Sequence, residues 1–95
     1  MTDLAKKVRK EVEKLVDPET GLTFGQMKMI TDVKEQKPGV VRVDFVPSSP
    51  FCPIAFKLAA DIKKAAEKVK EIKKALVYCH EHNMEEEINK MINKL

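Results

Sequence analysis

The sequence predicts a small two-layer α+β domain, with elements in the order α-β-β-α-β-α and a mainly antiparallel three-stranded sheet packed with helices. Apolar residues recur at spacings of three and four in residues 3–16 and 54–69, which is typical of amphipathic helices. Residues 40–46 alternate apolar and polar side chains, as a strand does. A chain of 95 residues supplies one hydrophobic core. We therefore expect a single domain over residues 1–95, with residues 81–95 as a C-terminal helical extension.

The first half of the chain predicts a helix followed by a hairpin. The helix of residues 3–16 ends at Asp17-Pro18-Glu19-Thr20-Gly21, because proline disfavours helical geometry in the residue before it and glycine permits a turn. Residues 27–34 and 40–46 form the next two elements, both strands. The Pro38-Gly39 turn between them predicts that they pair as a hairpin.

The second half predicts a helix, a strand and a helix. Proline punctuates the connection before the helix of residues 54–69, and residues 75–79 are a third strand candidate. The last helix follows from the spacing of Ile88, Met91, Ile92 and Leu95. One sheet face, bearing Leu76 and Tyr78, is left for the C-terminal helix or for a second subunit, so a homodimer is a hypothesis.

The composition describes a globular protein with a solvated surface, since 43% of residues are hydrophobic and 35% are charged. No apolar run approaches the roughly 20 residues that cross a bilayer, and the N-terminus has no hydrophobic signal core. We expect a cytoplasmic protein without a membrane partner. The 18 basic residues are interleaved with 15 acidic ones, and the net charge of +3 does not require a nucleic-acid partner.

Cys52 is the strongest candidate for a functional side chain. It precedes Pro53 at the start of the second predicted helix, where free backbone N–H groups and the helix dipole favour a thiolate. Prolines on both sides stiffen the loop, which predicts a presented thiol that reacts or contacts a metal. Ser48 and Ser49 add hydroxyl donors. The alternative is a small buried hydrophobe that fills a gap beside the helix.

Asp17 and Glu19 form a second candidate site, around Pro18. Their carboxylates are suited to metal ligation, to general-base catalysis or to fixing the cysteine loop. The alternative is a helix-ending turn with solvated carboxylates.

Two further segments carry chemistry-bearing residues. Cys79-His80-Glu81-His82 holds ligand types for zinc or iron, but strand geometry points Cys79 and His80 to opposite faces, so a buried Cys79 beside solvated histidines is the favoured interpretation. The second helix and its exit are basic, which leaves a nucleic-acid-binding module as an alternative function. Its lysines are Lys57, Lys63, Lys64, Lys68, Lys70, Lys73 and Lys74.

The acidic turn, the hairpin and Pro47-Ser48-Ser49-Pro50-Phe51-Cys52-Pro53 occur in an order that resembles the SufT/PaaD-like iron–sulfur cluster assembly family, formerly a domain of unknown function. The resemblance covers roughly residues 4–80. Gln26-Met27-Lys28 departs from it, because many members have Asp-Leu-Gly at this turn.

The resemblance implies an α+β fold in which the acidic loop lies near the cysteine loop. It also implies a role in delivering or maturing iron–sulfur clusters, often beside a P-loop scaffold ATPase. Carried over by position, Cys52 is the functional thiol, Asp17 and Glu19 match the acidic motif, and Ser48 and Ser49 occupy the hydroxyl-bearing places before the cysteine.

We therefore expect a non-enzymatic assembly factor that transfers clusters, or helps to insert them, into iron–sulfur client proteins. Iron or a cluster would be bound transiently at Cys52, and one cysteine supplies only part of the roughly four ligands that a cluster takes, so another chain or a small thiol must supply the rest. The other alternative is a thiol-dependent enzyme, in which His80 or His82 would be the base for Cys52.

Overall fold

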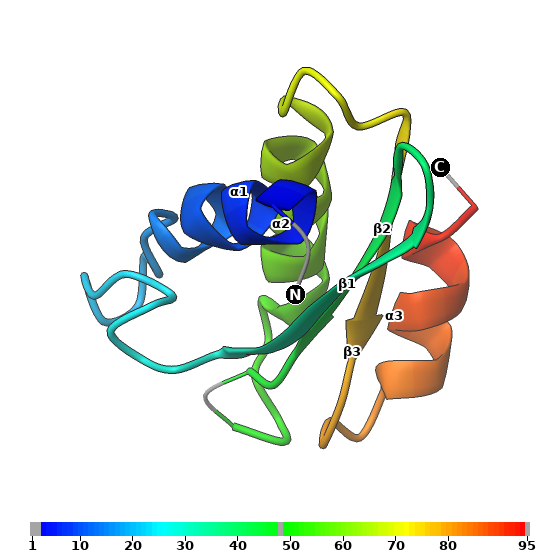
Figure 1. Cartoon of the computed structure of the whole chain (residues 1–95). Helices are drawn as coiled ribbons and strands as arrows, with labels where there is room; N and C mark the ends of the chain where they lie inside the picture. The colour runs from blue at the N-terminus through cyan, green and yellow to red at the C-terminus, as the bar shows by residue number, and fades with distance from the viewer. Residues whose placement is uncertain (1–2, 48, 95) are drawn as a thin grey trace.

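The computed structural model describes residues 3–47 and 49–94, and it confirms both the α+β class and the order of the elements. The six elements, drawn in Figure 1, are α1 (Asp3–Glu13), β1 (Ile30–Lys37), β2 (Val40–Phe45), α2 (Ala55–Glu67), β3 (Lys74–Cys79) and α3 (Glu85–Ile92). The helices α1 and α2 cover one face of the sheet, and α3 lies beside β3.

The sheet has the strand order β1-β2-β3 and is mixed. The predicted hairpin is present as the antiparallel pair β1–β2, whereas β2 and β3 run parallel. The physical reason is the α2 crossover, which carries the chain back along the sheet so that β3 starts at the same end as β2. As a result, the carboxyl ends of β2 and β3, and the loops that follow both strands, lie at one edge of the sheet.

The strand β1 begins later than the pattern of residues 27–34 predicts. Lys28 has a left-handed backbone, with φ of 55°, which interrupts an extended run. The register then slips by one residue between Ile30 and Asp32, so that Thr31 is the extra residue of a bulge. Thr31 is exposed and Ile30 is buried, which reverses the faces expected from simple alternation.

The hydrophobic core lies mainly between the sheet and the helices α1 and α2, and α3 adds Ile88 and Ile92 to it. The sheet contributes alternate residues of β2 and β3, and the helices contribute residues at helical spacing, as the sequence predicts. Full burial of a valine, leucine, isoleucine, phenylalanine or methionine side chain stabilises the fold by about 1.5–3 kcal/mol. The largest fully buried side chains are Phe24, Phe45, Met29, Leu58, Ile62 and Ile92.

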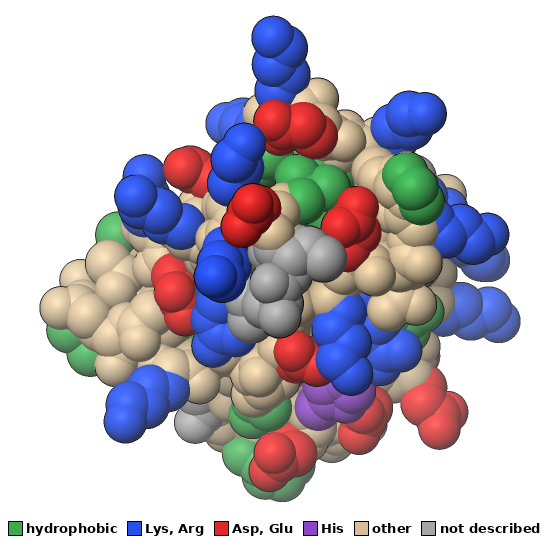
Figure 2. All heavy atoms as spheres, in the orientation of Figure 1, with side chains coloured by type: hydrophobic (Ala, Val, Ile, Leu, Met, Phe, Trp, Pro, Cys, Tyr) green, Lys and Arg blue, Asp and Glu red, His purple; other side chains and the backbone are tan. Residues whose placement is uncertain are grey.

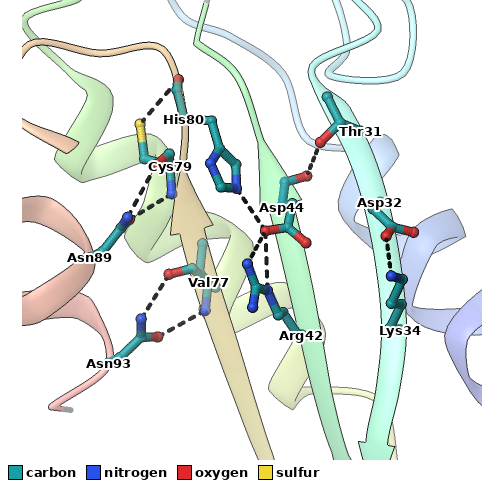
Figure 3. A network of polar contacts seen from close by, with 10 residues as sticks. All are labelled: Thr31, Asp32, Lys34, Arg42, Asp44, Val77, Cys79, His80, Asn89 and Asn93. Atoms are coloured by element: carbon teal, nitrogen blue, oxygen red, sulfur yellow. Dashed lines mark hydrogen bonds and ion pairs between the residues drawn. The ribbon is translucent and has the colours of Figure 1, made fainter. Parts of the chain in front are cut away.

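The helix α3 covers the outer edge of β3 rather than lying across the face that bears Tyr78. Asn93 accepts a hydrogen bond from Val77 N–H at 2.8 Å and donates one to Val77 O at 3.0 Å. Asn89 pairs with the backbone of Cys79 in the same way, at 2.6 and 3.1 Å (Figure 3). Two amide side chains one helical turn apart thus replace a fourth strand at an otherwise open edge.

None of the helices among the described residues has the length and apolar character that crossing a membrane requires.

Candidate functional site

Cys52 lies in the loop before α2, but its side chain is only 4% exposed and belongs to the hydrophobic core. The expectation of a presented thiol is therefore wrong for this conformation. The loop makes a turn in which Cys52 N–H donates to Ser49 O at 3.2 Å, and the neighbouring Phe51 takes the outward position instead. The helix begins at Ala55, so Cys52 lies just outside its first turn.

The cysteine loop is held on two sides. Ser49 Oγ accepts a hydrogen bond from Phe51 N–H at 3.1 Å, which orders the loop from within. From the segment after β3, Asn83 N–H donates to Pro50 O at 3.0 Å. Because the parallel strands end at the same edge, the two loops that follow them are joined.

His82 provides the second link between these loops, and it is buried. Its Nδ1 accepts a hydrogen bond from Met84 N–H at 3.0 Å, so Nε2 carries the proton and donates to Cys52 O at 3.0 Å. Both ring nitrogens are thereby used on backbone groups. The expectation of a solvated histidine is wrong at this position, and His82 fixes the backbone of Cys52 rather than facing its thiol as a base.

Asp17 is fully buried, which a solvated helix-ending turn does not predict. Its Oδ1 accepts a hydrogen bond from Glu19 N–H at 2.8 Å, and its carbonyl accepts one from Gly21 N–H at 2.8 Å. Gly21 has φ of 75°, a conformation that glycine adopts without strain. Oδ2 of Asp17 has no hydrogen-bond partner among the described residues, and such buried atoms are rare in native structures.

Glu19 is exposed, so the two acidic residues of the turn differ in environment. The hydrogen bonds that link Asp17 to residues 19, 21 and 22 all lie within its own loop. Ser49 shapes the cysteine loop through its backbone and hydroxyl, whereas Ser48 lies outside the described residues. In the described part of the chain, no group of three Cys, His, Asp or Glu side chains is arranged to hold a metal ion.

Cys79 is buried at the end of β3, as expected. Burial raises the pKa of its thiol to about 11, and the negative charges of Glu85 and of an ionised Cys52 add to the shift. Cys79 is therefore protonated at neutral pH, which makes it a weak nucleophile and a poor metal ligand.

A charged cluster on the open face of the sheet was not predicted as a unit. Asp44 Oδ1 accepts hydrogen bonds from both Arg42 Nε, at 3.2 Å, and Nη2, at 3.0 Å, and it lies 2.7 Å from His80 Nε2 (Figure 3). The Arg42 guanidinium also stacks on Tyr78, 4.1 Å from the ring centre. Strand alternation places Arg42 and Asp44 on one face, but their meeting with His80 requires the parallel direction of β3.

The lysine-rich helix is less available than its sequence indicates. Lys63 is buried and donates to Ala75 O at 2.6 Å, with Glu67 3.2 Å away. Lys57 pairs with Asp61 at 2.9 Å. Figure 2 shows basic and acidic side chains interleaved over the face in view, without a continuous basic stripe. This arrangement gives little support to a nucleic-acid interface.

The fold and the site define a class of small α+β domain in which a cysteine loop enters a helix and a buried acidic turn follows the first helix. Comparison with known proteins identifies the family. A sequence model of the iron–sulfur cluster assembly protein family matches residues 5–77. The chain belongs to this family, which confirms the resemblance found in its motifs.

Two individual proteins are similar to this chain. An uncharacterised protein of Methanocaldococcus jannaschii is 30% identical over 80 residues, which are 84% of each chain. A crystal structure of a domain of unknown function, DUF59, from Bacillus anthracis has a TM-score of 0.75 and 22% identity. That match covers 94% of this chain and 87% of the other, and it shows that the fold is shared. A general role in iron–sulfur cluster assembly follows from the family.

Proposed function

We propose that this chain is a non-enzymatic carrier that holds iron or an iron–sulfur cluster briefly at Cys52 and passes it to client apoproteins. The observation that carries the proposal is the position of Cys52, in a family-matched loop that hydrogen bonds pin at the entrance of α2. Cys79 is the weaker candidate, because its raised pKa keeps the thiol protonated.

The cargo site is shared with a second molecule. A cluster takes about four protein ligands, and the described residues offer no group of three that could hold a metal. A second copy of this chain, a P-loop scaffold ATPase of the kind that the resemblance implies, or the client itself supplies the remaining ligands. Because Cys52 is 4% exposed, the cysteine loop has to move before the thiol contacts the cargo.

A thiol-dependent enzyme is the weaker alternative, because it needs a base beside the sulfur. Both nitrogens of His82 are used by backbone groups, and His80 is hydrogen-bonded to Asp44 on the open sheet face.

The test is anaerobic reconstitution with ferrous iron, sulfide and a small thiol, followed by transfer to an apo iron–sulfur protein. Bound iron and visible absorption are measured for the wild type, for Cys52→Ser and for the matched control Cys79→Ser. We expect the wild type and Cys79→Ser to take up and transfer iron and sulfide, and Cys52→Ser to do neither. Equal uptake and transfer by Cys52→Ser would refute the proposal. Light scattering of the loaded protein then distinguishes a dimer from a monomer.

A further inference from the structure

An apolar groove lies directly over Cys52, between the cysteine loop, the start of α2 and the helix α3. Its volume is about 330 Å³, and Cys52 is among its lining residues. Four lining side chains are large, hydrophobic and exposed: Phe51 by 74%, Phe56 by 40%, Met84 by 51% and Met91 by 56%. Only two other large hydrophobic side chains among the described residues are comparably exposed. Exposed apolar surface concentrated in one place is typical of a binding site.

The groove is preformed. Asn89 and Asn93 fix α3 to the edge of β3, and the bond from Asn83 N–H to Pro50 O fixes the cysteine loop to the segment before α3. The Ser49 hydroxyl holds the backbone of Phe51 while its ring stays outside. An exposed aromatic side chain on a hydrogen-bonded backbone is suited to be an interface anchor, because the backbone loses little entropy on binding.

The charge of the groove restricts what fits it. Glu87 is its one lining carboxylate, and neither lysine nor arginine is among the lining residues. Glu85 and Glu86 precede Glu87 in the first turn of α3, so the acidic side chains gather at one end of that helix. The complementary occupant is an apolar segment that carries lysine or arginine next to its apolar side chains.

We propose that this groove binds an apolar, basic segment of the client apoprotein and thereby brings the client beside Cys52. The inference rests on the proposed carrier function and names how that carrier recognises its client. The family match ends at residue 77, so α3 and the segment before it, which form one wall of the groove, lie outside the matched region. One wall of the groove thus lies in the part of the chain that the family model does not match, whereas Phe51 and Phe56 of the other wall lie within the matched region.

The binding test uses a fluorescein-labelled helical peptide with leucines on one face and lysines beside them, and a second peptide with glutamates in place of the lysines. Fluorescence anisotropy measures binding to the metal-free protein. We expect the lysine peptide to bind at least tenfold more tightly than the glutamate peptide, and Phe51→Ser to weaken its binding at least tenfold. The matched control Leu22→Ser changes a side chain that is 45% exposed outside the groove, and it should bind like the wild type.

Two further variants test the charge preference of the groove separately from iron uptake at Cys52. Glu87→Lys should remove the preference for the lysine peptide. Cys52→Ser should fail to take up iron, whereas Phe51→Ser should take up iron normally and transfer it to the apoprotein at least tenfold more slowly. If the wild type takes up no iron, the carrier function is refuted, whereas the peptide-binding results still test the groove.

The inference is overturned if Phe51→Ser and Leu22→Ser bind the peptide equally, or if Glu87→Lys leaves the preference unchanged. It is also overturned if light scattering finds a dimer of the metal-free wild type that Phe51→Ser converts to a monomer. In that case the occupant of the groove is a second copy of the chain.

Discussion

Replacing His82 by alanine should release the cysteine loop and raise the reactivity of Cys52. The imidazole makes two hydrogen bonds, one to Cys52 O and one from Met84 N–H, both 3.0 Å long. After the substitution Cys52 O retains a weaker contact with Ala55 N–H at 3.4 Å, and water can reach the half-exposed Met84. The loss therefore lies at the low end of the usual range, about 1–2 kcal/mol.

This free energy converts directly into a labelling rate. Because Cys52 is 4% exposed, a reagent reaches its sulfur mainly when the loop opens, and the rate follows the opening equilibrium. A change of about 1–2 kcal/mol in local opening corresponds to a rate increase of roughly 5- to 30-fold. The assay is alkylation by iodoacetamide under native conditions at neutral pH, with modified peptides quantified by mass spectrometry.

The matched control is His80→Ala, since His80 is hydrogen-bonded to Asp44 on the open face of the sheet and to none of the described residues of the cysteine loop. We expect Cys52 to react at the wild-type rate in that variant. If His82→Ala and His80→Ala alter the rate equally, or if neither alters it, the loop is not held by His82 and the reasoning is refuted.

Three further predictions concern the fold around the site. Asn93→Ala should lower the free energy of unfolding, measured by urea denaturation, by about 1–3 kcal/mol, because Val77 N–H and O lose their hydrogen-bond partner at the sheet edge. The control Asn83→Ala should change the free energy of unfolding by less than about 0.5 kcal/mol. Cys79 should resist alkylation in the native protein at pH 7, because a pKa of about 11 leaves roughly one thiol in ten thousand ionised. The alkylation rate should rise about tenfold per pH unit until the pH approaches 11, and rapid labelling of the native protein at pH 7 would contradict the raised pKa. Gly39→Ala should lower the thermal unfolding midpoint, since Gly39 has φ of 83° and an added Cβ would lie 3.1 Å from Lys73 Cγ. Each kcal/mol lost from the free energy of unfolding corresponds to about 4–8 °C. An unchanged midpoint in calorimetry would show that the turn relaxes.

Much of the fold could be predicted from local patterns. The stripe in α1, the alternation of Val41, Val43 and Phe45, and the stripe in α2 each depend on a period that neighbouring residues reveal by themselves. The start of β1 could not be predicted in the same way, because the left-handed Lys28 belongs to a turn that is hydrogen-bonded to Gly25, and the bulge at Thr31 arises from pairing with β2. Pairing is a long-range property, and a shift of one residue exchanges the faces of a strand.

The candidate site, like the fold, could be predicted from the sequence only in part. Its residue types and their order along the chain, with Cys52 framed by prolines and Asp17 beside Pro18, were readable in the sequence, and so was the family. The burial of Cys52, the two hydrogen bonds of His82 and the groove beneath Phe51 were decided only by the tertiary structure. The physical reason is the parallel pairing of β2 and β3, which brings the loops after both strands to one edge, where residues about 30 positions apart complete each other's hydrogen bonds.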